Sequence, residues 1–302
     1  MERNLQTVLT YFGHFSYAPR FTEILTFFPQ KISKKNLHIL LRKEAENKKI
    51  LRLPNNKQFS PSLCPTNYQL LTTNCTQYTL PQYSIAVHNK RAFSPLDVHP
   101  ALRQLKWYIQ VLTWIRGVRF VGITGASALE GLRSNDDLDL CIVTAPRMLW
   151  TSRACVVIVA KLLAIHGKKG VCLNLFFDES DLVISKQKQN SYIAHELLQM
   201  KPIIDKNEIY KRFLSENKWI YGFFPNAQPR NTKHVSCIIK TRRRSMLHVT
   251  CYMLHALIDH LFKSLQLPLI YRNKTGFFIS TTQLWLFKSD FEKKLRRMRL
   301  VV

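Results

Sequence analysis

Apolar residues recur with the three- to four-residue spacing of amphipathic helices in three stretches near the N-terminus, residues 5–12, 21–28 and 37–41. Pro29 ends the second stretch, because proline lacks the N–H that a continuing helix needs. Ser33 stands where it would cap the N-terminus of the third helix. The pattern therefore predicts three short helices at the start of the chain.

A small β-ribbon is expected directly after the third helix. Residues 50–53 and 58–60 predict two short strands, and residues 54–56 (Pro-Asn-Asn) are typical of a turn. The order of helix, helix, basic helix and ribbon resembles a winged helix, which we assign to residues 1–60.

The outer face of the third predicted helix is basic, with Lys34, Lys35 and Arg42. The winged-helix resemblance implies that this face would lie on DNA. The alternative is a winged-helix fold used only for packing or protein contact, with a solvated basic face.

The next segment has little periodicity. Residues 61–90 are rich in Pro, Thr, Asn, Gln and Tyr, so residues 61–99 are predicted to be a linker or extension. A helix is predicted over residues 100–115 with one apolar face, which includes Ile109 and Leu112. We interpret Trp107 and Trp114 in this helix as core packing, with base stacking as the alternative.

A strand, a glycine turn and an acidic pair follow. Residues 118–124 predict a strand, and the sequence Gly-Ala-Ser-Ala at residues 125–128 turns it into a short helix. Asp137 and Asp139 then lead into a second strand over residues 140–143. Because residues i and i+2 of a strand face the same side, the two aspartates should project together while the leucine after each enters the core.

Two carboxylates held this close repel each other, so the spacing predicts a bound cation. Oxygen ligands favour Mg²⁺, which proteins bind through a few carboxylates together with substrate phosphates. The tight turn at Gly125 would present backbone N–H groups to those phosphates. The alternative is an acidic turn without a metal.

This arrangement resembles the DNA polymerase beta superfamily of nucleotidyltransferases, in which a Gly-Ser or Gly-Gly turn precedes an Asp-x-Asp strand. The stretch over residues 100–226 is also similar to uncharacterised bacterial proteins with this domain, for example in Asp136-Asp137-Leu138-Asp139-Leu140 and in the Ala-His-Glu sequence at residues 194–196. The resemblance implies that Asp137 and Asp139 hold two Mg²⁺ ions, and that Gly125, Ala126 and Ser127 serve the phosphates of an NTP. Arg153 would reach the triphosphate, or else pair with an acid such as Asp139.

The superfamily pattern places a third carboxylate on a later strand, where this chain has Asn174 within predicted strand 171–177. An amide is a poor base for an acceptor hydroxyl. Asp178 and Asp181 lie just beyond the strand and would be substitutes; otherwise turnover has been lost. His195 and Glu196 lack the second histidine of a His-Glu-x-x-His zinc motif, so His195 is expected to line the site or to pack in the core.

Charge divides the chain into a balanced centre and basic flanks. The net charge is +26, residues 1–60 carry 11 Lys and Arg against 4 Asp and Glu, and residues 226–302 carry 15 against 3. Residues 118–225 carry 14 against 11. The flanks predict contact with a phosphate backbone, DNA or RNA, to which the run Arg242, Arg243 and Arg244 would contribute. The alternatives are a basic proteome or an acidic partner surface for the flanks, and a solvated loop for the arginine run.

The seven cysteines are scattered and contain no Cys-x-x-Cys pair, which favours reduced thiols and a cytoplasmic protein. We expect neither a secretory leader nor a membrane partner. The predicted class is α+β, with a small mixed sheet of the nucleotidyltransferase fold at residues 100–226 and a basic, helical C-terminal region at 227–302. The expected activity is Mg²⁺-dependent transfer of a nucleoside monophosphate from an NTP; the alternative is a catalytically silent fold that binds nucleic acid or regulates.

Overall fold

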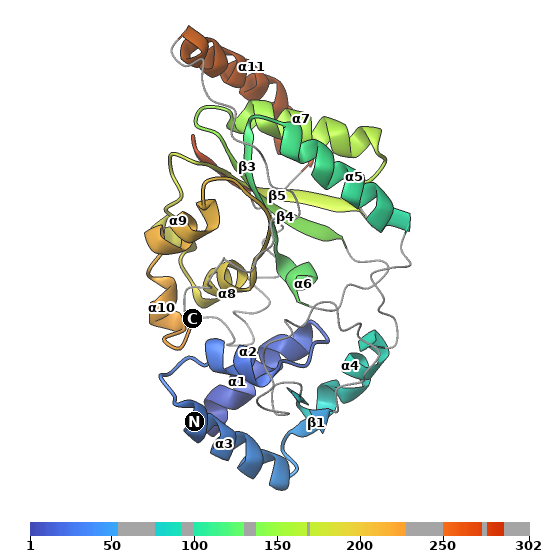
Figure 1. Cartoon of the computed structure of the whole chain (residues 1–302), viewed down its shortest axis with the longest axis vertical. Coiled ribbons are helices and arrows are strands. Elements are labelled where there is room, and N and C mark those ends of the chain that lie inside the picture. The colour runs from blue at the N-terminus through green and yellow to red at the C-terminus, as the bar shows by residue number, and fades with distance from the viewer. Residues whose placement is uncertain are drawn as a thin grey trace. The chain divides into compact units, whose positions relative to one another are not determined.

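The computed structural model describes residues 1–53, 76–91, 100–129, 137–167, 170–227, 250–273 and 277–286 (Figure 1). It confirms a mixed α+β chain with a mixed sheet. The chain separates into two compact units. Unit 1 comprises Met1–Ser94 with Trp219–Gln228, and unit 2 comprises Pro95–Lys218 with Pro229–Val301.

Unit 1 is built from helices and a two-stranded ribbon. Its elements are α1 Glu2–His14, α2 Phe21–Thr26, α3 Lys34–Glu46, β1 Leu51–Leu53, β2 Gln77–Thr79, the 3₁₀ turn Pro81–Tyr83, α4 Ser84–Arg91 and α10 Ile220–Phe223. The three predicted helices are confirmed, and Ser33 caps α3 by accepting a hydrogen bond from the backbone N–H of Asn36 at 3.1 Å. The fully buried side chains of Phe12, Phe28 and Leu37 lie at the predicted apolar positions.

The ribbon differs from the prediction in its second strand. β1 pairs antiparallel with β2, so that Leu51 lies opposite Thr79. The predicted partner, residues 58–60, lies outside the described residues. β2 comes instead from the segment predicted to be a linker, and its central Tyr78 is buried. A short Gln-Tyr-Thr strand carries too little periodicity to stand out within a polar segment.

The segment Trp219–Gln228 belongs to unit 1, whereas the sequence placed residues up to 226 in the core domain. The Asn226 side chain accepts a hydrogen bond from the N–H of Ile32 at 2.9 Å and donates to the carbonyls of Phe28 and Gln30 at 3.1 and 2.7 Å. One asparagine thus satisfies three backbone groups nearly 200 positions away. No local pattern predicts such a pairing.

Unit 2 contains a six-stranded sheet in the order β6-β3-β4-β5-β8-β7. The strands are β3 Val118–Ile123, β4 Leu138–Thr144, β5 Val171–Asp178, β6 Lys201–Asp205, β7 Phe278–Ile279 and β8 Gln283–Trp285. β4 and β5 are parallel, and the other neighbours are antiparallel. The C-terminal region, predicted to be helical, therefore also supplies two strands that extend the sheet beyond β5.

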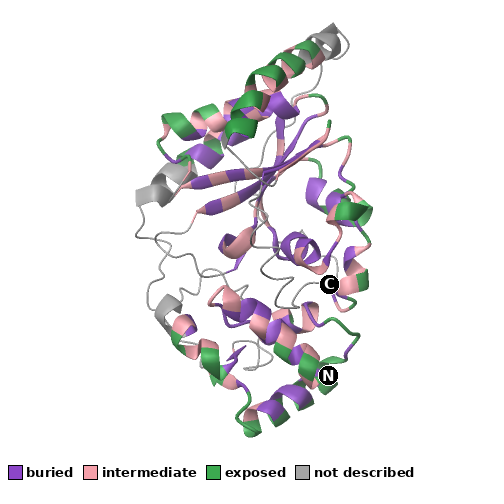
Figure 2. Cartoon of the chain, turned by 180° about the vertical axis from the view of Figure 1, so that it is seen from behind, coloured by how far each residue is buried: buried purple, intermediate pink, exposed green. Residues whose placement is uncertain are grey.

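Helices cover the two faces of this sheet (Figure 1). The core on one face contains side chains from α5 Pro100–Trp114, α7 Leu149–Leu162 and α11 Thr250–Asn273, packed on Leu138, Leu140 and Ile142 of β4. On the other face lie α8 Ser191–Gln199 and α9 Ile209–Glu216, with Phe120 stacked on Tyr210 at a centroid distance of 6.0 Å. Figure 2 shows the buried residues concentrated along the strands. The remaining elements are α6 Gly125–Ala128 and the 3₁₀ turn Lys186–Lys188.

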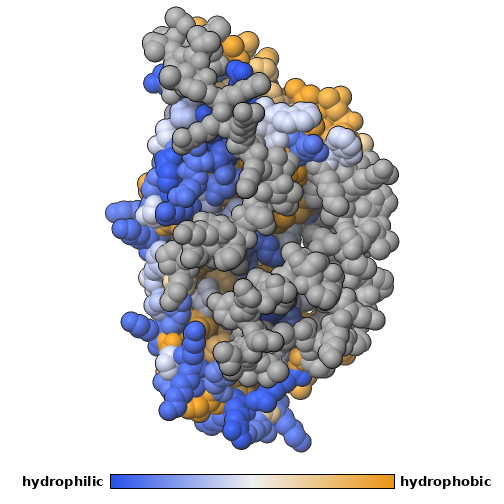
Figure 3. All heavy atoms as spheres, in the orientation of Figure 1, coloured by the Kyte–Doolittle hydropathy of each residue, from blue (hydrophilic) through white to orange (hydrophobic). Residues whose placement is uncertain are grey.

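Several large apolar side chains point away from this core. On α11 they are Leu257, Leu261, Leu265 and Leu269. Figure 3 shows apolar residues over the upper part of its view, where α7 and α11 lie. Within the described ranges, no helix is long and apolar enough to cross a membrane.

The interpretation of Trp107 and Trp114 as core residues is wrong. Their side chains are 58% and 70% exposed, whereas Tyr108 and Leu112 of the same helix are fully buried. Each tryptophan stands two positions from a residue of the apolar stripe, which is about 200° around the helix. α5 therefore buries its stripe and presents both tryptophans outward.

Candidate functional site

The glycine turn and the acidic strand meet at one end of the central sheet. β3 ends at Ile123, and the backbone N–H of Thr124 donates to the carbonyl of Asp139 at 2.9 Å. Gly125 follows with φ +64°, a conformation that favours glycine. A Cβ on Gly125 would lie 2.5 Å from Oδ2 of Asp139, so a larger residue at this position would displace the carboxylate.

The strand alternation predicted around the acidic pair is confirmed for the leucines. Leu138 and Leu140 are buried in the core on the helix-covered face of α5 and α7. Asp139, which lies between them, therefore projects toward the opposite face. Asp137 directly precedes β4, and its carbonyl accepts a hydrogen bond from the Ser127 hydroxyl at 2.9 Å.

A carboxylate that the sequence analysis left without a role lies beside this turn. Oε2 of Glu196, on α8, accepts a hydrogen bond from the backbone N–H of Gly125 at 2.7 Å. Oε1 of Glu196 accepts from the side-chain amide of Gln199 at 2.8 Å, and the same amide reaches the carbonyl of Gly125 at 3.3 Å. His195 contacts Gln199 through Nδ1 at 3.1 Å. The α8 side chains therefore hold both polar groups of the Gly125 peptide.

Burial strongly changes the ionisation of this group. Desolvation raises the pKa of Glu196 to about 8, the hydrogen bond from Gly125 lowers it in part, and the negative charge of Asp139 raises it further. Desolvation also lowers the pKa of His195 to about 3, which keeps the imidazole neutral. His195 is buried and positions Gln199, which agrees with the expectation that it packs in the core.

Asn174 lies where the register of β4 and β5 shifts, between the pairs Leu140–Leu173 and Cys141–Leu175. Cys172 pairs with Asp139 across the parallel β4–β5 ladder, and the amide of Asn174 donates to Sγ of Cys172 at 3.0 Å. The neutral Asn174 thus contacts the residue that pairs with Asp139, and its place as the third ligand position stays a prediction.

Asp178 and Asp181 cannot replace the missing carboxylate. Asp178 pairs with Thr144, six residues along β5 from Cys172, a distance of about 20 Å in a strand. Its oxygens accept hydrogen bonds from the N–H of Arg147 at 2.7 Å and from the N–H of Ser180 at 2.9 Å. Asp181 accepts from Thr282 at 2.6 Å.

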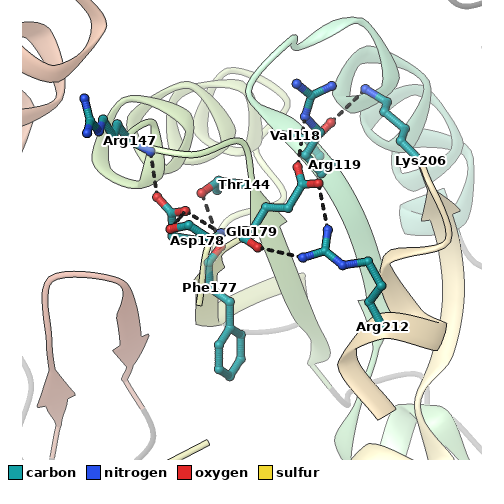
Figure 4. A network of polar contacts seen from close by, with 10 residues as sticks. Val118, Arg119, Thr144, Arg147, Phe177, Asp178, Glu179, Lys206 and Arg212 are labelled. Carbon is teal, nitrogen blue, oxygen red and sulfur yellow. Dashed lines mark hydrogen bonds and ion pairs between the residues drawn. The ribbon is translucent and has the colours of Figure 1, made fainter. Parts of the chain in front are cut away.

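A polar network occupies that far end of β4 and β5 (Figure 4). Glu179 pairs with Arg212 at 3.0 Å and with Arg119 at 3.5 Å. The ammonium group of Lys206 donates to the carbonyls of Thr113 and Val118 at 3.0 and 2.7 Å. These contacts join α5, α9 and the sheet, which indicates a role in packing.

Arg153 lies away from the glycine turn, contrary to both expectations for it. The residue is on α7, where Nη1 donates to the side chain of Gln266 on α11 and the guanidinium lies 5.9 Å from the ring centroid of Phe176. Phe176 belongs to the core on the α7 side, so Arg153 is on the opposite face from Asp139. Desolvation lowers its pKa to about 10.

The groups expected to serve phosphates are engaged within the chain. The N–H of Gly125 donates to Glu196, and the hydroxyl of Ser127 donates to the carbonyl of Asp137. Across the described part of the chain, no three His, Cys, Asp or Glu side chains are grouped so that they could hold a metal ion. The expected two-ion site therefore stays a prediction.

The predicted basic face of unit 1 is exposed on α3. Lys34 and Lys35 are exposed, and Arg42 forms a 2.9 Å ion pair with Glu46 one turn later. α3 and the ribbon enclose a hollow of about 320 Å³, lined by His38, Ile39, Arg42, Arg52, Thr76 and Tyr78. The predicted contribution of Arg242, Arg243 and Arg244 lies outside the described residues.

One signal in the sequence would have identified Glu196. It is flanked by Ala194, Leu197 and Leu198, and a carboxylate among residues that a helix buries is uncommon unless it has a specific partner. No protein-family model, curated protein or solved structure gives a significant match to this chain.

Proposed function

We propose that unit 2 transfers a nucleoside monophosphate from an NTP to an acceptor hydroxyl in a Mg²⁺-dependent reaction. The observation that supports this most is the contact between the Gly125 turn and Asp139 at the start of β4. Asp139 shares this position with a second carboxylate, Glu196, whose pKa is raised partly by the charge of Asp139. Crowded carboxylate oxygens are a suitable donor set for Mg²⁺.

Asp137 and Asp139 would hold the ions, which when bound would neutralise charge on the triphosphate. The acceptor oxygen would attack the α-phosphorus in line, its proton would pass to a base, and the bond to the leaving pyrophosphate would break. Glu196 is the buried carboxylate available near Asp139, where Asn174 offers only an amide. In this role Glu196 would have to release the N–H of Gly125, which the nucleotide phosphates would then occupy.

The test is binding of labelled NTP with and without Mg²⁺, followed by a search for labelled product with mixed RNA, DNA, protein and small-molecule acceptors. The Asp137→Asn, Asp139→Asn double variant should lose Mg²⁺-dependent binding and remain folded. Asp181→Asn is the matched control, because that carboxylate lies beyond the far end of β5. Equal NTP binding by the double variant and the control would contradict the proposal.

A second candidate is a catalytically silent fold that binds nucleic acid. It is favoured by the two hydrogen bonds that engage the Gly125 peptide and by the amide at Asn174. This candidate predicts no labelled product from the wild-type chain and no gain from Asn174→Asp. If the enzyme candidate is right, the same substitution should raise a slow turnover, because a positioned base contributes about 10²–10⁴-fold.

DNA or RNA binding through α3 has its own test. Charge reversal of Lys34, Lys35 and Arg42 should weaken binding and flatten its salt dependence, since fewer counterions would be released. Lys211, an exposed lysine on α9, provides the control substitution. A salt dependence that is the same in both variants would remove α3 from the interface.

A further inference from the structure

We propose that the outward face of α5 is a stacking platform for single-stranded nucleic acid, formed by Trp107 and Trp114. The inference does not depend on nucleotidyl transfer, because it involves only α5 and the residues around it. Both indole side chains are mostly exposed, at 58% and 70%. Their direction is set by the core, since Tyr108 and Leu112 on the other side of the helix are fully buried.

Two of the five tryptophans are exposed, and both lie on α5. Trp150 and Trp285 of the same unit are each only 2% exposed. Tryptophan is highly buried on average because its large apolar surface is costly to leave in water, so two exposed on one helix face indicate a binding surface.

The spacing suits two bases rather than one. Trp107 and Trp114 are seven residues apart, which is close to two helical turns and about 10 Å along the axis. They therefore lie on one face, too far apart to sandwich a single ring. Gln110, which is exposed, stands between them and offers an amide to a base edge or a phosphate.

The charge around α5 indicates which kind of molecule binds there. Residues 98–129 contain no Asp or Glu, so no negative charge within this segment opposes the approach of a polyanion. Arg116, two positions after Trp114, is exposed. An acidic polymer with accessible flat rings complements such a surface, and single-stranded nucleic acid has both features. A duplex does not, because its bases are already stacked on one another.

The experiment titrates the full-length protein with oligothymidylate and follows both tryptophan emission and the anisotropy of a labelled strand. The two exposed indoles should be quenched on binding, while the buried Trp150 and Trp285 should not respond. Loss of this quenching in the Leu variants separates it from the emission of the partly buried Trp219. Trp107→Leu and Trp114→Leu should each weaken binding by about 5- to 100-fold, the range reported by alanine substitution at stacking positions. The Phe variants keep a ring and should retain most of the affinity.

Two controls separate stacking from general effects. Leu162→Ala trims an 80% exposed side chain of α7 and should leave oligothymidylate affinity unchanged. Inorganic polyphosphate, a polyanion without bases, should bind the wild type and the Leu variants equally. Circular dichroism should show that the Leu variants remain folded, because neither substitution reaches the core.

Three outcomes would overturn the proposal. The first is unchanged oligothymidylate affinity in the double Leu variant. The second is an equal loss of polyphosphate and oligothymidylate binding, which would indicate a general disturbance of the surface and not the loss of stacking. The third is a wild-type oligomer that dissociates in the double Leu variant without loss of strand binding, which would make this face a contact between protein chains.

Discussion

Glu196→Gln provides the sharpest test of the buried network around Gly125. The substitution keeps a carbonyl oxygen that can accept from the N–H of Gly125 and removes the ionisable group. Folding raises the pKa of Glu196 from 4.5 to about 8. Because the folded protein binds a proton more tightly than the unfolded chain, this group stabilises the fold at low pH. That contribution is lost as pH rises from 4.5 to about 8.

His195 titrates in part of the same range with the opposite sign. Burial lowers its pKa from 6.5 to about 3, so its effect on stability changes only below pH 6.5. Between pH 6.5 and 8 Glu196 therefore acts without His195. At about 1.4 kcal/mol for each pH unit, the wild-type protein should lose about 2 kcal/mol in this window through Glu196.

Urea denaturation of both proteins, in EDTA at several values between pH 6.5 and 8, measures this difference. The wild type should lose about 2 kcal/mol more than Glu196→Gln across the window, and the variant should be the more stable protein at pH 8. Any other group that titrates is present in both proteins and cancels. Parallel stability curves would refute the burial of Glu196 and its contact with Gly125.

Three further substitutions test other contacts. Gly125→Ala should destabilise unit 2 by more than about 1 kcal/mol, from the positive φ and the clash with Asp139, in a thermal melt; an unchanged melt would contradict the geometry of the turn. Asn226→Ala should cost about 2–3 kcal/mol in urea, because it leaves three backbone groups of unit 1 without partners, and an effect below about 0.5 kcal/mol would argue against these bonds. Arg153→Met should leave Mg²⁺-dependent NTP binding unchanged, since Arg153 donates to Gln266 on the sheet face opposite Asp139. Loss of NTP binding in a folded variant would show that Arg153 belongs to the nucleotide site.

Local patterns determined the parts of the fold that depend on near neighbours. The three N-terminal helices, the Ser33 cap and the burial of Leu138 and Leu140 follow from helix and strand periods, which are set by backbone geometry. The tight turn at Gly125 was also predicted, because glycine between a strand and a short helix is typical of a turn. The apolar stripe of α5 already placed Trp107 and Trp114 on the opposite side of the helix. Their burial was predicted wrongly because tryptophan is usually buried, whereas here the position on the helix decides.

Only the tertiary structure decided contacts between distant segments. Glu196 reaches the N–H of Gly125 across 71 positions, and Asn226 reaches Ile32 across 194. The period of a helix tells which residues share a face, but not which face meets the sheet or what it finds there. For the same reason the sequence could not place Arg153 on the α11 side, add β8 to the edge of β5, or replace the expected ribbon strand with β2. Those choices follow from packing free energy summed over the whole core, which no short segment contains.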